Sequence, residues 1–250
     1  MRVCAVQTDI VWEDKQANMA RCRRFYEQAA GCALVVFPEL TLTGFSQERL
    51  LCEPPEGASV SFFRELTRGS DTAVCFGYAA SEGGRAFNRM CVCAHGEIAA
   101  QYDKLHPFTI GGESFSAGER AVCADIAGAR VGLTICYDLR FPELTRRLAL
   151  QGLDILFVLS QWPAERVTQL RSLAVARAIE NQAFAVCCNS CGKAEKTVYG
   201  GRSFIANPLG EISASAGENE EIISAECDVQ KFTEICKKIP VFCDRRPELY

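Results

Sequence analysis

The chain has 250 residues, of which 48% are hydrophobic, and 27 basic and 31 acidic side chains give a formal net charge of −4. This composition argues against intrinsic disorder, and the acidic balance argues against a nucleic-acid partner bound by a basic face. No stretch is typical of a linker or of a repeat, so we expect one domain over residues 1–250, with a tail at about 238–250.

The longest apolar runs, residues 32–37 and 183–188, are far shorter than the roughly 20 residues that span a bilayer. At the N-terminus, Gln7, Thr8 and Asp9 interrupt the apolar run too early for a signal peptide. We therefore expect a cytoplasmic protein with no membrane partner.

In chain order, the sequence predicts a strand at 3–7, a helix at 15–30, a strand at 32–37, a helix at 59–68 and strands at 72–78, 87–94, 97–102 and 130–135. It then predicts a helix at 142–151, a strand at 154–159, a helix at 165–181, strands at 184–189, 203–206, 211–214 and 221–227, and a helix at 229–237. Asp14 is typical of a helix N-cap, and His95-Gly96 is typical of a hairpin turn. The mixture predicts an α/β protein with one mixed sheet or two sheets covered by helices.

Cysteine is unusually frequent, with 15 residues. A chain of this length needs no disulfide scaffold, so we expect most cysteines to be reduced and to behave as small buried hydrophobic residues. Five lie in strand-like runs: Cys4, Cys32, Cys75, Cys91 and Cys187. Cys188 and Cys191 form one C-x-x-C, but a zinc site would need a second ligand pair, and no helix begins at the motif as in redox dithiols. We expect no metal and no cofactor, and keep a redox or metal protein as an alternative.

Common catalytic motifs are missing, including G-x-S-x-G, the phosphate-binding loop, H-E-x-x-H and G-x-G-x-x-G. The chain has two histidines, His95 in the predicted turn and His106. A cysteine–histidine protease would have to use His106, and no other feature supports that alternative.

Three predicted strands end next to a reactive side chain. Glu39 follows residues 35–38, Lys104 follows the strand at 97–102, and Cys136 follows the strand at 130–135. Taken singly, these residues would be a solvated carboxylate, a surface lysine and a core cysteine. Loops at strand ends are, however, where α/β proteins gather their sites.

Together the three residue types suffice for acyl transfer without histidine. A carboxylate can take the proton of a thiol, and an ammonium favours the thiolate and stabilises the oxyanion of a tetrahedral intermediate. The backbone N–H of Tyr137, directly after Cys136, is a natural second donor to the oxyanion.

Longer motifs around these residues resemble the nitrilase, or carbon–nitrogen hydrolase, superfamily. They are Phe37-Pro38-Glu39, Tyr102-Asp103-Lys104, Cys136-Tyr137-Asp138-Leu139-Arg140-Phe141-Pro142, Gln161-Trp162-Pro163, the run 176–182 and the run 207–211. The resemblance implies a four-layer α-β-β-α sandwich, usually assembled as a homodimer through helices.

The resemblance also implies roles for residues. Cys136 would be the nucleophile that forms a thioester, Glu39 the general base, and Lys104 the cation beside the oxyanion. Glu113 matches a second glutamate that, in the family, helps to orient the lysine and the substrate. No metal or cofactor is implied.

Within the family, the motifs are most similar to the omega-amidase branch. These enzymes hydrolyse the terminal amide of a small 2-oxo-dicarboxylate monoamide, such as 2-oxoglutaramate or 2-oxosuccinamate. We expect Arg140 to bind the substrate carboxylate, unless it pairs with Glu143 or Glu180, and Trp162 and Phe45 to form walls of the pocket.

The sequence departs from the family pattern at Gln161, where the family has asparagine. This departure bears on which amide is the substrate. Three alternatives remain. The first is the same triad acting on another amide, a carbamoyl-amine or a nitrile, and the second is a non-catalytic binding protein with this fold. The third is the redox or metal protein that the cysteine count suggests.

Overall fold

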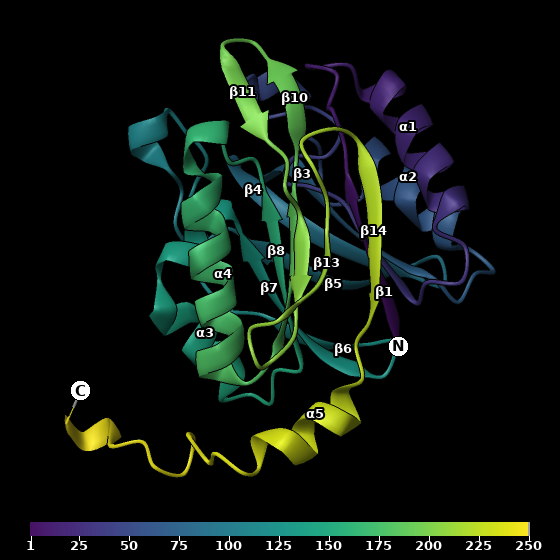
Figure 1. The fold of residues 1–250 in the computed structure, drawn as a ribbon. Coiled ribbons are helices and arrows are strands. Elements are labelled where there is room, and N and C mark those ends of the chain that lie inside the picture. The colour runs from purple at the N-terminus through teal and green to yellow at the C-terminus, as the bar shows by residue number, and fades with distance from the viewer. Residues whose placement is uncertain (250) are drawn as a thin grey trace.

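Two six-stranded sheets form the centre of the structure, a computed structural model that describes residues 1–249 (Figure 1). The first sheet has the order β14-β1-β2-β3-β4-β5, and the second has the order β13-β12-β9-β8-β7-β6. Their strands are β1 (Arg2–Gln7), β2 (Leu34–Val36), β3 (Ala73–Glu82), β4 (Arg85–Ala94), β5 (Glu97–Asp103), β6 (Cys123–Ile126), β7 (Ala129–Ile135), β8 (Ile155–Ser160), β9 (Phe184–Asn189), β12 (Phe204–Ala206), β13 (Ile212–Ser215) and β14 (Glu221–Glu226). A separate hairpin pairs β10 (Cys191–Ala194) with β11 (Thr197–Gly200).

Helices cover the outer face of each sheet. They are α1 (Lys15–Gln28), α2 (Ala58–Thr67), α3 (Pro142–Ala149) and α4 (Val167–Asn181), with α5 (Val229–Cys236) near the C-terminus. Figure 1 shows α1 and α2 beside the first sheet, and α3 and α4 beside the second. The four layers are thus helix, sheet, sheet and helix, which confirms the expected α-β-β-α sandwich.

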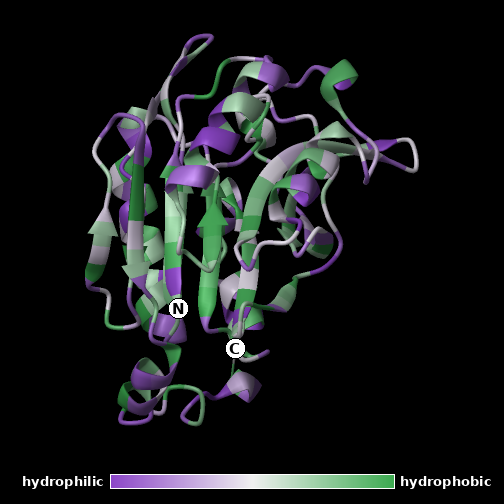
Figure 2. Ribbon diagram, turned by 90° about the vertical axis from the view of Figure 1, so that its right-hand side faces the viewer, coloured by the Kyte–Doolittle hydropathy of each residue, from purple (hydrophilic) through white to green (hydrophobic). Residues whose placement is uncertain are grey.

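Three apolar clusters hold the layers together. The largest fills the space between the sheets and includes Val3, Leu34, Val131 and Phe157, all with no exposed surface. A second cluster lies under α1 and α2, and a third lies under α3 and α4. Figure 2 shows the central strands as the most hydrophobic part of the ribbon. Strands buried on both faces explain why the sequence reads as continuous apolar runs instead of an alternating pattern.

Strand direction brings the carboxyl ends of several strands together. β1, β2 and β3 are parallel, as are β7, β8 and β9, and two antiparallel steps from β3 through β4 make β5 parallel to β2. In each sheet, the segments that follow these strands therefore leave from one edge.

Local signals in the sequence placed most elements correctly. The Asp14 side chain accepts a hydrogen bond from the N–H of Ala17 at 2.9 Å, as an N-cap does. His95 and Gly96 have φ angles of 52° and 81°, which fit the two-residue turn between β4 and β5. β6 and the β10–β11 hairpin were not predicted, because their four-residue strands are too short for a clear apolar pattern.

Close backbone packing explains one glycine. Gly77 lies in β3 against the segment that follows β2, and a Cβ there would be 2.5 Å from the backbone nitrogen of Leu40. Any side chain at residue 77 would therefore displace the backbone next to Glu39.

The expectation for the cysteines needs one correction. Cys4 and Cys32 form a disulfide that links β1 to the segment just before β2, so treating these two as free thiols was wrong. The strands of these two segments are adjacent and parallel, which the sequence could not reveal. The thirteen other cysteines are free.

None of the helices within residues 1–249 is long and apolar enough to cross a membrane. The C-terminal segment runs along one end of the sandwich (Figure 1). There the side chain of Gln182 donates hydrogen bonds to the carbonyls of Cys236 and Ile239, at 3.2 and 2.8 Å.

Candidate active site

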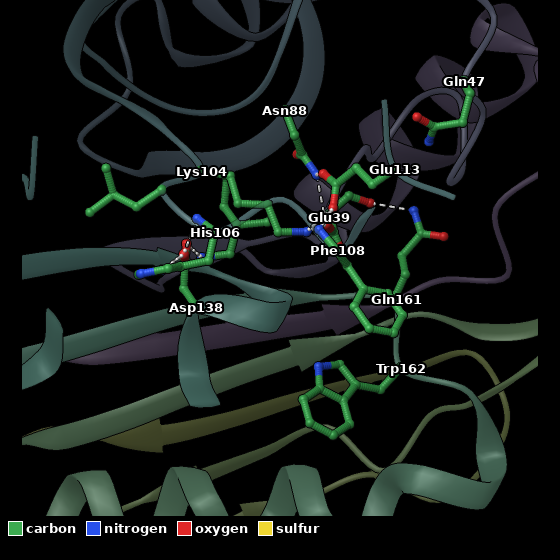
Figure 3. Close-up of polar contacts among 12 residues, drawn as sticks. Glu39, Gln47, Asn88, Lys104, His106, Phe108, Glu113, Asp138, Gln161 and Trp162 are labelled. Carbon is green, nitrogen blue, oxygen red and sulfur yellow. Dashed lines mark hydrogen bonds and ion pairs between the residues drawn. The ribbon is translucent and has the colours of Figure 1, made fainter. Parts of the chain in front are cut away.

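A buried charge cluster lies where β2 and β5 end. It consists of Glu39, Lys104, Glu113 and Asn88, whose exposed fractions are 0%, 1%, 3% and 0%. Lys104 Nζ is 2.9 Å from Glu39 Oε1 and 2.8 Å from Glu113 Oε2. Figure 3 shows the two carboxylates and the Asn88 amide converging on the lysine.

The Asn88 side chain donates a hydrogen bond to each of the two carboxylates. Its Nδ2 donates to Glu39 Oε1 at 2.7 Å and to Glu113 Oε1 at 2.9 Å. The backbone N–H of Phe108 donates to Glu113 Oε2 at 2.6 Å, so Glu113 accepts hydrogen bonds from Asn88, Lys104 and Phe108. Glu39 Oε2 is buried and has no hydrogen-bond partner within residues 1–249, which leaves it available to take a proton.

Burial and the neighbouring charges shift the pKa values of Glu39 and Lys104. Burial raises the pKa of Glu39, the charge of Glu113 raises it further, and Lys104 opposes both. Burial alone would lower the pKa of Lys104, but the negative charges around it outweigh burial and raise that pKa. Lys104 is therefore a permanent cation, and Glu39 is a stronger base than a solvated glutamate.

Cys136 comes directly after β7, at the start of a 3-10 turn over Cys136–Arg140. Its φ angle is 49°, in the left-handed region that a non-glycine residue rarely adopts, and such strain is frequent at functional sites. Burial and the nearby Glu39 carboxylate raise the pKa of its thiol well above the usual value, while Lys104 and a hydrogen bond from the backbone N–H of Gln161 oppose the shift. The resting group is thus a thiol that needs a base.

The backbone N–H of Tyr137 lies in the first turn of this short helix. Groups at that position have no acceptor within their own helix. It remains a suitable donor to an oxyanion formed beside Cys136.

A pocket of about 280 Å³, including part of its open mouth, adjoins the cysteine. It is lined by Phe108, Cys136, Tyr137, Arg140, Gln161, Trp162, Pro163 and Arg166. Most of these side chains are aromatic or cationic, and the small volume suits a compact anionic molecule.

Among residues 1–249, neither arginine of this pocket has a carboxylate at hydrogen-bond distance. Arg140 lies over the Trp162 ring, with its guanidinium carbon 4.7 Å from the ring centroid, and donates to the neutral Oε1 of Gln169 at 2.7 Å. Arg166 lies 5.4 Å from the ring centroid of Phe108. Its buried Nε makes no hydrogen bond within residues 1–249, and the paired Glu165 oxygen is 3.9 Å away.

The structure brings most of the expected site residues together. Glu39, Lys104 and Glu113 share the charge cluster, and Arg140 and Trp162 line the pocket beside Cys136. Arg140 pairs with neither Glu143 nor Glu180 within the described residues, since Arg177 holds Glu180. Phe45 is not among the residues that line this pocket, and its ring centroid is 5.9 Å from Lys104 Nζ.

Sequence reasoning missed two residues of the site. Asn88 lies in the middle of β4, where no motif marks it. Arg166 lies three residues after Pro163, and its position just after the Gln161-Trp162-Pro163 motif could have marked it as a pocket residue.

Other chemistries find little support. His106 is not among the residues lining the pocket, and its ring instead contacts Asp138 and stacks on Phe141. Among residues 1–249, no group of three or more His, Cys, Asp or Glu side chains is arranged to hold a metal ion.

Three comparisons with known proteins all indicate the same family. The family model for carbon-nitrogen hydrolase matches residues 2–236. A 2-oxoglutaramate amidase of Bacillus subtilis is 32% identical to this chain, and the match covers 99% of this chain and 98% of the relative. The omega-amidase YafV of Escherichia coli is 30% identical, and the match covers 98% of this chain and 96% of the relative. The crystal structure of XC1258 from Xanthomonas campestris, a CN-hydrolase superfamily protein with an arsenic adduct in its active site, has a TM-score of 0.93 at 27% identity, covering 98% of this chain and 97% of that chain.

These matches extend over nearly the whole chain, and the relatives are enzymes that cleave carbon–nitrogen bonds. The protein is therefore a hydrolase of carbon–nitrogen bonds, and the chain belongs to the carbon–nitrogen hydrolase family.

Proposed function

We propose that the protein is an omega-amidase, which converts a small 2-oxo-dicarboxylate monoamide such as 2-oxoglutaramate or 2-oxosuccinamate to the 2-oxo acid and ammonia. One observation carries this proposal: Cys136 lies in one pocket with two arginines and within the electrostatic reach of the buried Glu39–Lys104 pair. The cysteine and the pair supply amide chemistry, and the arginines supply a site for the carboxylate at the other end of the substrate.

In the first step, Glu39 takes the thiol proton as Cys136 Sγ attacks the amide carbon. The Lys104 ammonium and the Tyr137 N–H stabilise the negative charge that develops on the carbonyl oxygen. When the carbon–nitrogen bond breaks, Glu39 returns the proton to the nitrogen, and ammonia leaves a thioester on Cys136.

In the second step, water hydrolyses the thioester. Glu39 takes a proton from the water as its oxygen attacks the acyl carbon, and Cys136 leaves and recovers its proton. The products are the carboxylic acid and the free enzyme. Neither step needs a metal or a cofactor.

The other substrate classes named above would begin with the same attack by Cys136 Sγ on a carbon bonded to nitrogen. An uncharged amide, a nitrile or a carbamoyl-amine without a carboxylate would leave Arg140 and Arg166 without an anionic partner in a pocket lined by aromatic rings. The two arginines therefore favour an anionic amide. The expected homodimer and the cytoplasmic location stay predictions.

The direct test is ammonia release from 2-oxoglutaramate by the wild-type protein and by Cys136→Ala. We expect turnover by the wild type and its loss in the variant, because no other group of the pocket can form the thioester. Cys191→Ala, which changes another free cysteine, is the matched control and should keep activity. Equal turnover by Cys136→Ala and the wild type would overturn the mechanism. Failure with 2-oxoglutaramate but turnover of another amide, nitrile or carbamoyl-amine would overturn the substrate assignment alone.

The pH profile reports the state of Glu39. A general base must be ionised, so kcat/KM should fall as pH drops through the pKa of Glu39, which is raised above the usual value of about 4.3. Glu113→Gln removes a negative charge that raises this pKa, so the acid limb of the profile should move to lower pH even though the maximal rate falls.

Glu119→Gln is the control for the pH experiment, because Glu119 is 76% exposed and pairs with Arg85. Its acid limb should match that of the wild type. An acid limb that does not move in Glu113→Gln, or that moves upward, would contradict the assignment of Glu39 as the base.

Arg166 should determine recognition of the carboxylate. Arg166→Gln is expected to raise KM for 2-oxoglutaramate about tenfold, the loss of roughly 1.4 kcal/mol from one charge-assisted hydrogen bond at a partly exposed site. Hydrolysis of butyramide, which has no carboxylate, should change little. Arg202→Gln, at an exposed arginine paired with Glu218, is the matched control. An equal loss for both substrates would contradict the assignment.

A further inference from the structure

One buried carboxylate has no place in the chemistry just described. Asp138 has an exposed fraction of 0%, and none of the pocket-lining side chains bonds to it. Its Oδ2 accepts hydrogen bonds from the Tyr102 hydroxyl at 2.7 Å and from the N–H of Ile135 at 3.0 Å. Its Oδ1 accepts from the N–H of His106 at 3.0 Å and contacts His106 Nδ1 at 2.8 Å.

The direction of the fourth contact follows from chemistry. An ionised carboxylate can only accept hydrogen bonds, so the His106 ring must carry its proton on Nδ1 and donate it. Burial raises the pKa of Tyr102 well above its usual value, and the charge of Asp138 adds to the shift, so the hydroxyl also remains a donor. All four contacts are therefore hydrogen bonds to one buried carboxylate. Hydrogen bonds to an ionised acceptor are stronger than those between neutral groups.

The positions of these donors in the chain are informative. Tyr102 and His106 stand two residues before and two residues after Lys104, and Asp138 stands two residues after Cys136. Lys104 belongs to the segment that leaves β5 of the first sheet, whereas Cys136 belongs to the segment that leaves β7 of the second. Asp138 thus joins the two sheets immediately beside the lysine and the cysteine, and Figure 3 shows its carboxylate next to His106.

We propose that Asp138 is a positioning residue, which fixes the Lys104 segment to the Cys136 segment through Tyr102 and His106. This proposal rests on the catalytic roles proposed above for Lys104 and Cys136. The oxyanion donors must be held within a fraction of an ångström, and displacements of about 1 Å cost roughly a hundredfold in rate. Arg166 lies in a different segment, the 3-10 turn Ala164–Arg166, so carboxylate binding by this arginine does not depend on the connection.

His106 offers the cleanest test, because it makes two separable contacts. Its ring donates to Asp138, and it also stacks on Phe141 with a centroid separation of 3.7 Å and an interplanar angle of 10°. His106→Asn keeps an N–H at the place of Nδ1 but loses the stacked ring. His106→Phe keeps a stacked ring but loses the N–H donor.

The two variants should differ in rate and not in binding. We expect His106→Phe to lower kcat by about ten- to a hundredfold and His106→Asn to keep kcat within about threefold of the wild type. The inhibition constant of 2-oxoglutarate, the product of the proposed reaction, should stay the same in both variants because Arg166, which lies outside the connected segments, is unchanged. Thermal unfolding of each variant shows that the comparison concerns folded protein.

Two results would overturn the positioning role. One is a kcat of His106→Phe equal to that of the wild type, and the other is a loss in His106→Asn as large as that in His106→Phe, which would assign the effect to the stacked ring. Tyr102→Phe, which removes the second side-chain donor to Asp138, should lower kcat in the same way and also leave the inhibition constant unchanged.

The Cys136→Ala experiment separates this proposal from the proposed function. Turnover that survives in Cys136→Ala would end the catalytic assignment, and the positioning role with it. Turnover that is lost in Cys136→Ala but unchanged in His106→Phe would end the positioning role alone.

Discussion

The pairing of Lys104 with Glu39 and Glu113 sets the conditions for the rest of the site. A lysine that is 1% exposed loses nearly all its hydration, which costs several kcal/mol unless charges and hydrogen bonds replace the water. Two carboxylates provide that replacement, and the Asn88 amide donates a hydrogen bond to each of them. Burial is the main cause of the raised pKa of Glu39, and because two negative charges face one positive charge, the charge of Glu113 adds to that shift.

Burial and the nearby negative charge also explain why the Cys136 side chain rests as a thiol. Burial and Glu39 both disfavour a thiolate at Cys136, so in the proposed mechanism proton transfer to Glu39 accompanies attack on the substrate. A buried, negatively charged centre also repels anions. An anionic amide can enter only if its charge is bound elsewhere, and the cations of Arg140 and Arg166 lie in the pocket next to the cysteine. The proposed carboxylate site and the buried charge cluster are thus complementary parts of one electrostatic arrangement.

Much of the architecture could be predicted because it depends on local patterns. Apolar runs gave most of the strands, and Glu39, Lys104 and Cys136 were recognisable because each directly follows one. Glu113 lies in a loop without such a pattern, and the family resemblance was needed to find it. The left-handed backbone at Cys136 has no signal in the residue type, since strain of this kind is imposed by the surrounding fold.

Contacts between segments that are distant in the chain could not be predicted from the sequence. Asn88 faces Glu39 only because β4 pairs with β3 in one register, and no single sequence reveals which residue of a buried strand takes that place. The Cys4–Cys32 disulfide and the four hydrogen bonds to Asp138 likewise depend on how segments meet in space.

Detection of the covalent intermediate tests the central claim most directly. Wild-type protein would be mixed with 2-oxoglutaramate, quenched in acid within a turnover, digested, and examined by mass spectrometry for the acyl group on each cysteine-containing peptide. We predict an acyl group on the peptide that contains Cys136, removable by neutral hydroxylamine as a thioester should be. An acyl group found on a different residue, in protein that is turning over the amide, would contradict the account.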